Sequence, residues 1–505
     1  MKRARTLLRR SFYRRDLAVG RQVMHGAAYQ FVSIGLRTLI TIGSTAILAR
    51  LLLPADFGNV AMATVVTELA GLLGALGLSN VLVQRATINR LQLDTFFWAS
   101  VGLGCALSAA VMVLSYPASS FFGDAKVGEI LRVLGLNFIL GSLSIVPTTV
   151  LSRMMRFGTE FWIQNITIIL RTLAAIAAAA AGWGVWSLVV GALVGTVIST
   201  VLYFAAVPYA PRFRFCARTI TQSWRTSGGY LGNSGLYYLN TNLDLMLVGR
   251  ALGAASLGYY QSARSLTDEI RGRIAMPVQN VLFPAFSALQ SDRPKFRRLV
   301  LRAALLMAAL VVPIGFGVSA NAEALVRALY GDRWLPMVPV MQLFGLSASI
   351  RAATAISSPL FGANDRVALS FRYNLVGAGI TAAAVLVGTH WGVEGVALAV
   401  ALSTCYSLVG MYAAFRLIDL GLSDMLRVLL PPYCCAIVMW LGTWCVFSSG
   451  PISSWLEAST APTQLALRVL FGAAMYGCAL LAVSAELRRE LLNLRQRLPR
   501  RAGRA

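Results

Sequence analysis

Long apolar blocks are the feature that most restricts what this chain can fold into. Blocks such as residues 34–53 and 395–414 are as long as the roughly 20 residues that a helix needs to cross the ~30 Å hydrocarbon layer of a membrane. Hydrophobic residues make up 57% of the chain and charged residues 13%, whereas about 25% of the residues of a soluble protein are charged. The sequence therefore predicts an integral membrane protein.

The succession of these blocks predicts an all-α protein with about fourteen transmembrane helices. The eighth block is unusually long and polar, and Pro277 and Pro284 within it predict kinks, because proline removes a helical hydrogen bond. The expected helices lie at about residues 27–53, 58–83, 94–116, 129–151, 161–181, 184–207, 226–249, 257–289, 299–320, 336–361, 368–389, 392–415, 427–447 and 464–484.

The basic residues indicate how the chain is oriented in the membrane. Most of the 45 lie in alternate connections, among them residues 1–25, 212–225, 293–302 and the tail from Arg488. Basic residues beside helix ends favour the cytoplasmic side. We therefore expect both termini to be cytoplasmic, and we expect the net charge of +25 to contact anionic membrane lipids rather than nucleic acid.

The chain also repeats itself. When it is shifted by 200 positions, residues 50–82 match residues 250–282 at ten positions, and Glu68 falls on Asp268. A later block, around Trp183, matches the block around Trp391. Six predicted helices precede the second copy, so both copies begin on the same side. This pattern indicates a parallel repeat about an axis along the membrane normal, with a substrate site at the interface between the halves.

The repeat and the helix pattern together predict five segments. Leucines at helical spacing among the arginines of the last segment predict an interfacial helix on anionic lipid. The segments are a basic cytoplasmic N-terminal segment (1–25), an N-lobe of six helices (26–210), a C-lobe of six helices (211–416), two additional helices (417–485) and a basic cytoplasmic tail (486–505).

Several short motifs occur in the order in which a known family carries them. They are ARLLLPADFG at 49–58, LGL at 76–78, QR at 84–85, LGYY at 257–260, LFPAFS at 282–287 and YGDRW at 330–334. As a set they resemble the Wzx-like polysaccharide exporters. The resemblance covers about residues 25–415 and implies membership of the multidrug/oligosaccharidyl-lipid/polysaccharide exporter superfamily.

The resemblance implies a fold and a function. The fold is two six-helix lobes around a central cavity. The function is a flippase that moves undecaprenyl-diphosphate-linked oligosaccharide repeat units across the bacterial inner membrane by alternating access, for export of exopolysaccharide, capsule or O-antigen. Its partners are the lipid-linked substrate, membrane lipids and a polysaccharide polymerase with export machinery.

Arginines within the apolar blocks are the candidate substrate-binding residues. A charge at membrane depth is costly and is normally functional or paired, and the planar guanidinium suits a diphosphate because it can bind two oxygens at once. Internal pairing is the alternative, because Arg264 with Asp268 and Glu269 with Arg273 are four residues apart. The candidates are Arg37, Arg171, Arg264, Arg271 and Arg351.

The acidic residues that match across the repeat, Glu68 and Asp268, are candidates for coupling an ion to transport. Salt bridges to arginine are the alternative for both residues. The two histidines lack metal-ligand spacing, and six of the seven cysteines lie in apolar blocks, so we expect no metal, no cofactor and no disulfide framework. Gly191 and Gly195 form a small-residue pair that is typical of helix packing.

Three other functions are alternatives to the flippase. A membrane polymerase would need outer loops with catalytic groups, and the short outer connections carry no histidine or paired carboxylates suited to acid–base work, so we expect no enzyme. A multidrug exporter would favour acidic rather than arginine-rich helices, because its substrates are commonly cations. A flippase for the peptidoglycan lipid precursor would also need a cationic path and stays an alternative.

Overall fold

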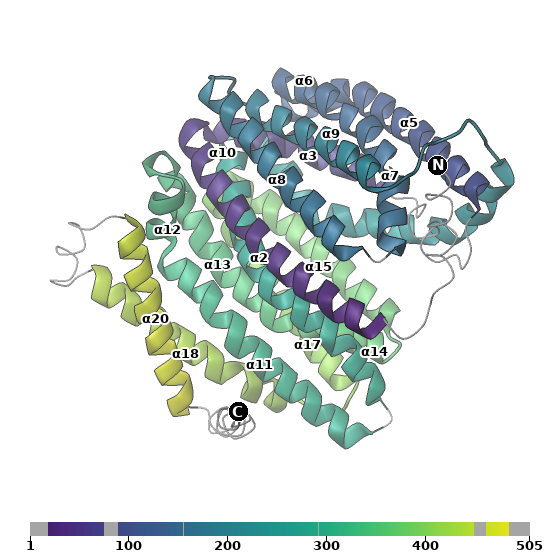
Figure 1. The fold of residues 1–505 in the computed structure, drawn as a ribbon. Coiled ribbons are helices and arrows are strands. Elements are labelled where there is room, and N and C mark those ends of the chain that lie inside the picture. Colours follow the sequence, from purple (N-terminus) through teal and green to yellow (C-terminus); the bar gives the residue numbers. More distant parts are fainter. Residues whose placement is uncertain (1–18, 75–88, 155, 291, 449–460, 484–505) are drawn as a thin grey trace, which may run out of the picture. The chain divides into compact units, whose positions relative to one another are not determined.

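The computed structural model describes residues 19–74, 89–154, 156–290, 292–448 and 461–483. Within these ranges every regular element is a helix, which confirms the all-α prediction (Figure 1). The chain divides into two compact units, Met1–Gln261 and Ser262–Ala505. The predicted lobe boundaries after residues 210 and 416 stay predictions.

The first unit is a bundle of helices. α8 packs against both α2 and α9, and α7 packs against α5 and α9. In Figure 1 the purple α2 can be followed alongside α8. The helices are α2 (Val19–Leu51), α3 (Pro54–Gly74), α5 (Arg90–Phe122), α6 (Ala125–Leu134), α7 (Leu136–Arg153), α8 (Phe157–Ala180) and α9 (Trp186–Ala206).

The turn between α5 and α6 shows how local sequence sets the helix ends. Gly123 ends α5 in the left-handed conformation, with φ at 71°, which a residue without a Cβ adopts at little cost. Asp124 then caps α6, because its side chain accepts a hydrogen bond of 2.9 Å from the backbone N–H of Lys126. α6 and α7 meet at Gly135 and together form one membrane-length stretch, Ala125–Arg153.

The connection after α9 is fastened to α5. Asp94 is fully buried, and its Oδ1 accepts hydrogen bonds from the Tyr209 hydroxyl at 3.1 Å and from the Arg212 backbone N–H at 3.3 Å. Burial, reinforced by the Asp94 carboxylate, raises the pKa of Tyr209 well above its ordinary value, so its phenol keeps the proton that it donates. The Trp98 indole N–H donates to the Arg212 carbonyl at 2.9 Å, and the ring of Phe213 stacks on Trp98.

α10 (Ala217–Ala288) contains both the seventh and the eighth predicted helix. Its backbone departs from helical geometry at Gly253, where φ is 79° and ψ is −177°. This glycine lies between the two predicted helices, and a side chain there would strain the backbone. The helical assignment continues through Pro277 and Pro284, and the predicted kinks at these prolines stay predictions.

The second unit is organised around α11, which packs against α13 and α18, and α18 in turn packs against α20. The helices after α10 are α11 (Arg293–Ala320), α12 (Ala322–Leu329), η1 (Asp332–Met337), α13 (Val338–Ala353), η2 (Thr354–Ile356), α14 (Ser357–Ala363), α15 (Val367–Gly388), η3 (Thr389–Trp391), α16 (Gly392–Thr404), α17 (Tyr406–Arg416), α18 (Leu422–Ser448) and α20 (Ala461–Val483).

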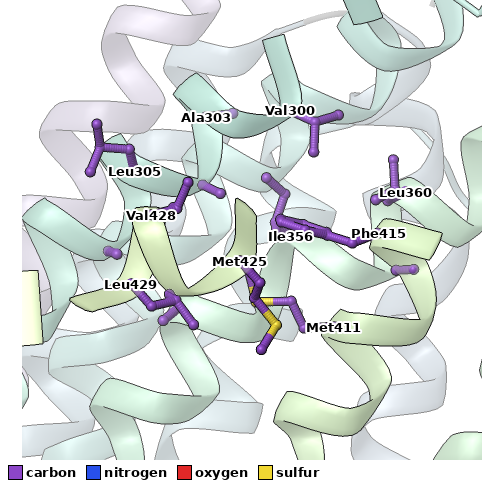
Figure 2. Close-up of a cluster of buried hydrophobic side chains, with 14 of the residues drawn as sticks. Val300, Ala303, Leu305, Ile356, Leu360, Met411, Phe415, Met425, Val428 and Leu429 are labelled. Atoms are coloured by element: carbon purple, nitrogen blue, oxygen red, sulfur yellow. The ribbon is translucent and has the colours of Figure 1, made fainter. Parts of the chain in front are cut away.

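Figure 2 shows a buried apolar cluster at the centre of this unit. Val300 from α11, Ile356 from η2, Met411 and Phe415 from α17 and Leu429 from α18 all belong to it. Helices in a membrane associate largely through close van der Waals packing, since the lipid tails are as apolar as the side chains. The cluster therefore holds together helices that are more than a hundred residues apart in sequence.

Each of the fourteen predicted crossings overlaps a helical segment of the structure, and residues 75–83 of the second crossing lie outside the described residues. Among the described residues, eight stretches are long and apolar enough to cross a membrane, and one of them, Ala368–Arg416, contains two predicted crossings. The remaining predicted crossings lie in α2, α3, α10 and the stretch from α13 to α14. The predicted interfacial helix of the tail lies outside the described residues.

The repeat is visible in how each half packs internally. α5 on α7, α7 on α9 and α8 on α9 in the first half correspond to α11 on α13, α13 on α16 and α15 on α16 in the second. Gly58 and Gly258 exchange equivalent contacts within the first unit. A Cβ on Gly58 would lie 1.8 Å from the Ala254 carbonyl oxygen, and a Cβ on Gly258 would lie 1.9 Å from the Pro54 oxygen. The two glycines therefore lie next to each other, Gly58 in the first turns of α3 and Gly258 just after the interruption of α10 at Gly253.

Candidate functional site

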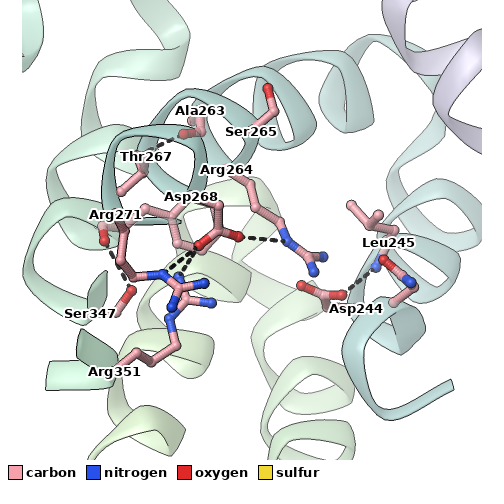
Figure 3. A network of polar contacts seen from close by, with 12 residues as sticks. Asp244, Leu245, Ala263, Arg264, Ser265, Thr267, Asp268, Arg271, Ser347 and Arg351 are labelled. Atoms are coloured by element: carbon pink, nitrogen blue, oxygen red, sulfur yellow. Dashed lines mark hydrogen bonds and ion pairs between the residues drawn. The ribbon is translucent and has the colours of Figure 1, made fainter. Parts of the chain in front are cut away.

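Three of the predicted arginines surround one carboxylate in the second unit (Figure 3). Oδ1 of Asp268 lies 3.2 Å from Nε of Arg271 and 3.1 Å from Nη2 of Arg351. Oδ2 of the same carboxylate lies 3.7 Å from Nε of Arg264. We call Arg264, Asp268, Arg271 and Arg351 the arginine cluster.

Helical spacing brings the first three members of the arginine cluster together. Residues 264, 268 and 271 of α10 are four and three positions apart, so their side chains share one face of the helix. Arg351 comes from the last turn of α13. The structure therefore confirms the pairing of Arg264 with Asp268 that the sequence left open. The side chain of Arg273 lies outside what the structure describes.

Pairing with Asp268 does not neutralise the arginine cluster. One carboxylate faces three guanidinium groups, so the four residues together keep an excess of positive charge. Their side chains are 11–29% exposed, which leaves part of the surface of each arginine accessible. A guanidinium has five N–H donors, and a single carboxylate cannot engage all the donors of three such groups. The cluster can therefore attract a further anion.

Arg37 and Arg171 lie in the first unit, apart in sequence but on helices that pack together, α2 and α8. Arg37 is half-buried, and its charge acts on the hydroxyl of Tyr203, which also hydrogen-bonds Gln164. Arg171 is exposed, and its side chain lies against Gly195 of α9. These two arginines belong to the first unit, and the arginine cluster belongs to the second.

The small-residue pair of α9 makes room for α8. A Cβ on Gly195 would lie 3.1 Å from Cδ of Arg171, and a Cβ on Gly191 would lie 2.8 Å from Cβ of Ala175. The prediction that Gly191 and Gly195 serve helix packing is confirmed. The same contact supports the aliphatic part of the Arg171 side chain.

Glu68 lies on α3 and accepts a hydrogen bond of 3.1 Å from the hydroxyl of Tyr238 on α10. The same hydroxyl lies 3.0 Å from the carbonyl oxygen of Val65. Asp268, the residue that matches Glu68 across the repeat, is paired with arginine instead. Sequence reasoning missed Tyr238, because a tyrosine carries no charge that would distinguish it among apolar residues.

A second pair of a carboxylate and a tyrosine, after Glu68 and Tyr238, lies within α10. Asp244 and Tyr260 are both buried, with the tyrosine hydroxyl 2.7 Å from Oδ2 of Asp244. The backbone N–H of Leu245 donates to the other carboxylate oxygen at 2.9 Å. The sequence signal was a lone acidic residue in an apolar block, and the tyrosine that accompanies it could be identified only from the structure.

The part of the chain that the structure describes contains no group of three histidine, cysteine or acidic side chains placed to hold a metal ion.

Comparisons with known proteins show which proteins this chain is similar to. A family model described as "Polysaccharide biosynthesis protein" matches residues 47–339. The succinoglycan biosynthesis transport protein ExoT of Rhizobium meliloti (strain 1021) is 27% identical over 342 residues, which cover 68% of this chain and 69% of that protein. The lipopolysaccharide biosynthesis protein WzxC of Escherichia coli (strain K12) is 26% identical over 368 residues, which cover 72% of this chain and 75% of that protein.

A solved structure of the lipid II flippase MurJ, in its inward closed conformation, has the same fold. It matches with a TM-score of 0.72 and covers 93% of this chain and 100% of that chain, at 14% sequence identity. At that identity the likeness establishes the architecture and not the substrate. The chain therefore has the all-α fold of that membrane protein.

Proposed function

The chain belongs to the family of polysaccharide biosynthesis proteins, whose model matches more than half of it, and we propose that it is a flippase for lipid-linked oligosaccharides. The proposed substrate is an undecaprenyl-diphosphate-linked repeat unit, which the protein moves across the bacterial inner membrane by alternating access. The product serves export of exopolysaccharide, capsule or O-antigen. The protein transports this substrate and does not transform it chemically.

The arginine cluster is the observation that carries the substrate assignment. A lipid diphosphate has an anionic headgroup that must pass through an apolar layer, and cationic groups at membrane depth lower the free energy of that passage. Arg264, Arg271 and Arg351 contact the diphosphate in our proposal, because their planar forks match phosphate oxygens. Arg37 and Arg171, in the first unit, contact phosphate or acidic sugars at another stage.

Glu68 is the proposed ion-coupling residue. Its carboxylate is exposed and contacts a neutral tyrosine hydroxyl. The three guanidinium groups around Asp268 repel a cation, so we assign Asp268 to the arginines and not to ion coupling.

The proposal extends to the surroundings of the protein. Both termini are cytoplasmic, as the distribution of basic residues predicts. The basic N-terminal segment and tail contact anionic lipid. A polysaccharide polymerase with its export machinery receives the translocated repeat units on the outer side.

Reconstitution tests the function directly. The purified protein is placed in liposomes with a fluorescent lipid-linked oligosaccharide, and a membrane-impermeant quencher reports how much lipid changes leaflet. We expect wild-type protein to accelerate the exchange and Arg351→Ala to slow it by about tenfold or more, since a lost charge-assisted pair is worth roughly 1.5–3 kcal/mol. Arg327→Ala is the matched control, because Arg327 pairs with Glu323 and Asp332 outside the cluster.

Two results would contradict the proposal. No acceleration by wild-type protein would exclude the flippase activity for that lipid. Equal slowing by Arg351→Ala and Arg327→Ala would assign the arginine cluster to folding. The same liposomes with the peptidoglycan lipid precursor, or with a cationic dye, test the two alternative transporters of this fold.

A further inference from the structure

Asp268 occupies the position within the arginine cluster that an anionic ligand would take. Its Oδ1 is shared between Arg271 of α10 and Arg351 of α13, and its Oδ2 faces Arg264 (Figure 3). One carboxylate thus connects two helices through three guanidinium groups. Carboxylate and phosphate oxygens bind the same guanidinium fork, so the two groups compete for the same donors.

The charges in the cluster have a specific balance. Three arginines contribute three positive charges and Asp268 contributes one negative charge, which leaves a net charge of two positive units on these four residues. A diphosphate diester carries one negative charge on each phosphate. Its headgroup therefore offers anionic oxygens on two phosphates to the three guanidinium groups, whereas a monophosphate diester offers them on one.

We propose that Asp268 is a displaceable internal anion of the arginine cluster. It holds the three arginines in place while the carrier is empty, and a phosphate group of the substrate takes over its donors when the substrate binds. This inference rests on the proposed function, because it names how the same site exchanges its ligand.

The physical consequence is that the protein binds the substrate more weakly than it would without Asp268, and also releases it more readily. Without an internal partner, three neighbouring guanidinium groups would repel one another and would bind a diphosphate tightly. With Asp268 present, each hydrogen bond that an arginine donates to phosphate replaces one that it donates to the carboxylate, so only the difference in free energy favours binding. When the substrate leaves, Asp268 returns, which lowers the free energy of the empty state and favours release.

The experiment measures binding of a prenyl diphosphate sugar and of the matched prenyl monophosphate sugar, both diesters, to the full-length protein in nanodiscs. We expect Asp268→Asn to lower the Kd for the diphosphate about tenfold, which corresponds to about 1.4 kcal/mol, and to slow leaflet exchange in the liposome assay. Arg351→Ala raises the Kd. Asp332→Asn is the matched control, because Asp332 pairs with Arg327 away from the cluster and its loss leaves Kd and exchange unchanged.

A second pair of variants keeps the test independent of folding. Asp268→Asn removes the carboxylate that contacts three arginines, so the same change is also made in an Arg271→Gln background, where two of these arginines remain. The double variant should bind the diphosphate more tightly than Arg271→Gln alone. Equal or weaker binding in both comparisons would overturn the inference and would leave Asp268 as a structural partner. If wild-type protein binds neither prenyl lipid, that result contradicts the proposed function itself, and the inference that depends on it is also contradicted.

Discussion

Arg351 differs from the other two arginines of the cluster because it comes from a separate helix. Arg264 and Arg271 lie on α10 with Asp268, so their pairing follows from helical spacing alone. Arg351 reaches the same carboxylate oxygen from the end of α13. It therefore links two helices of the second unit, and any movement between α10 and α13 changes its distance from Asp268.

Substituting Arg351 with lysine separates charge from geometry. Lysine keeps the positive charge but is a point donor without the planar fork, so it cannot bind two oxygens of a phosphate in parallel. We expect Arg351→Lys to retain part of the leaflet-exchange rate, between wild type and Arg351→Ala, at normal protein abundance. Arg327→Lys, outside the cluster, should match wild type. A lysine variant as inactive as the alanine variant would show that the fork, and not the charge, is essential.

The crossing of α3 with α10 depends on two glycines that the repeat makes equivalent. The shift of 200 residues predicted that Gly58 and Gly258 would occupy corresponding points. It did not predict that each would meet the backbone of the other copy, because sequence similarity records equivalence and not contact. Gly58 meets Ala254, and Gly258 meets Pro54, at distances that leave no room for a side chain. The close approach of the two backbones is thus a property of the pair of helices.

A methyl group at Gly58 should separate these helices. Its Cβ would lie 1.8 Å from a carbonyl oxygen of the facing backbone, and overpacking of this kind costs about 1–3 kcal/mol. We expect Gly58→Ala and Gly258→Ala to lower the Tm in detergent and to slow leaflet exchange.

Gly102→Ala is the control for this pair of substitutions, because a Cβ at Gly102 of α5 meets nothing within 4 Å. Alanine is favoured over glycine within a helix by up to about 1 kcal/mol, so this variant should be as stable as wild type or slightly more so. Unchanged Tm and exchange in both Gly58→Ala and Gly258→Ala would mean that α3 and α10 do not cross this closely in the membrane.

At the scale of the whole molecule, the length and spacing of the apolar blocks predicted where the chain is helical. They did not predict which residues far apart in the sequence contact each other. Every predicted crossing overlaps a helix in the described part of the chain, because a stretch of ~20 apolar residues has few other stable conformations in a membrane. The pairing of Asp268 with Arg351, and of Asp94 with the segment around Tyr209, joins residues that no local pattern connects. These contacts depend on how helices pack, which a single sequence does not record.

The side of the membrane on which a segment lies follows from whether an even or an odd number of crossings precedes it. α18 ends at Ser448 and α20 begins at Ala461, so the segment between them should lie on the outer side if both termini are cytoplasmic. Reporter fusions after Ser449 and after Arg500, two points outside the described residues, should therefore report outside and inside respectively. Fusions after Gly123, between α5 and α6, and after Asp292, before α11, serve as outer and inner references. If Ser449 and Arg500 report the same side, α20 does not cross the membrane. If they report inside and outside respectively, the number of crossings before α18 is wrong by one. Either result would overturn the fourteen-helix topology, and the second would also place the basic tail outside.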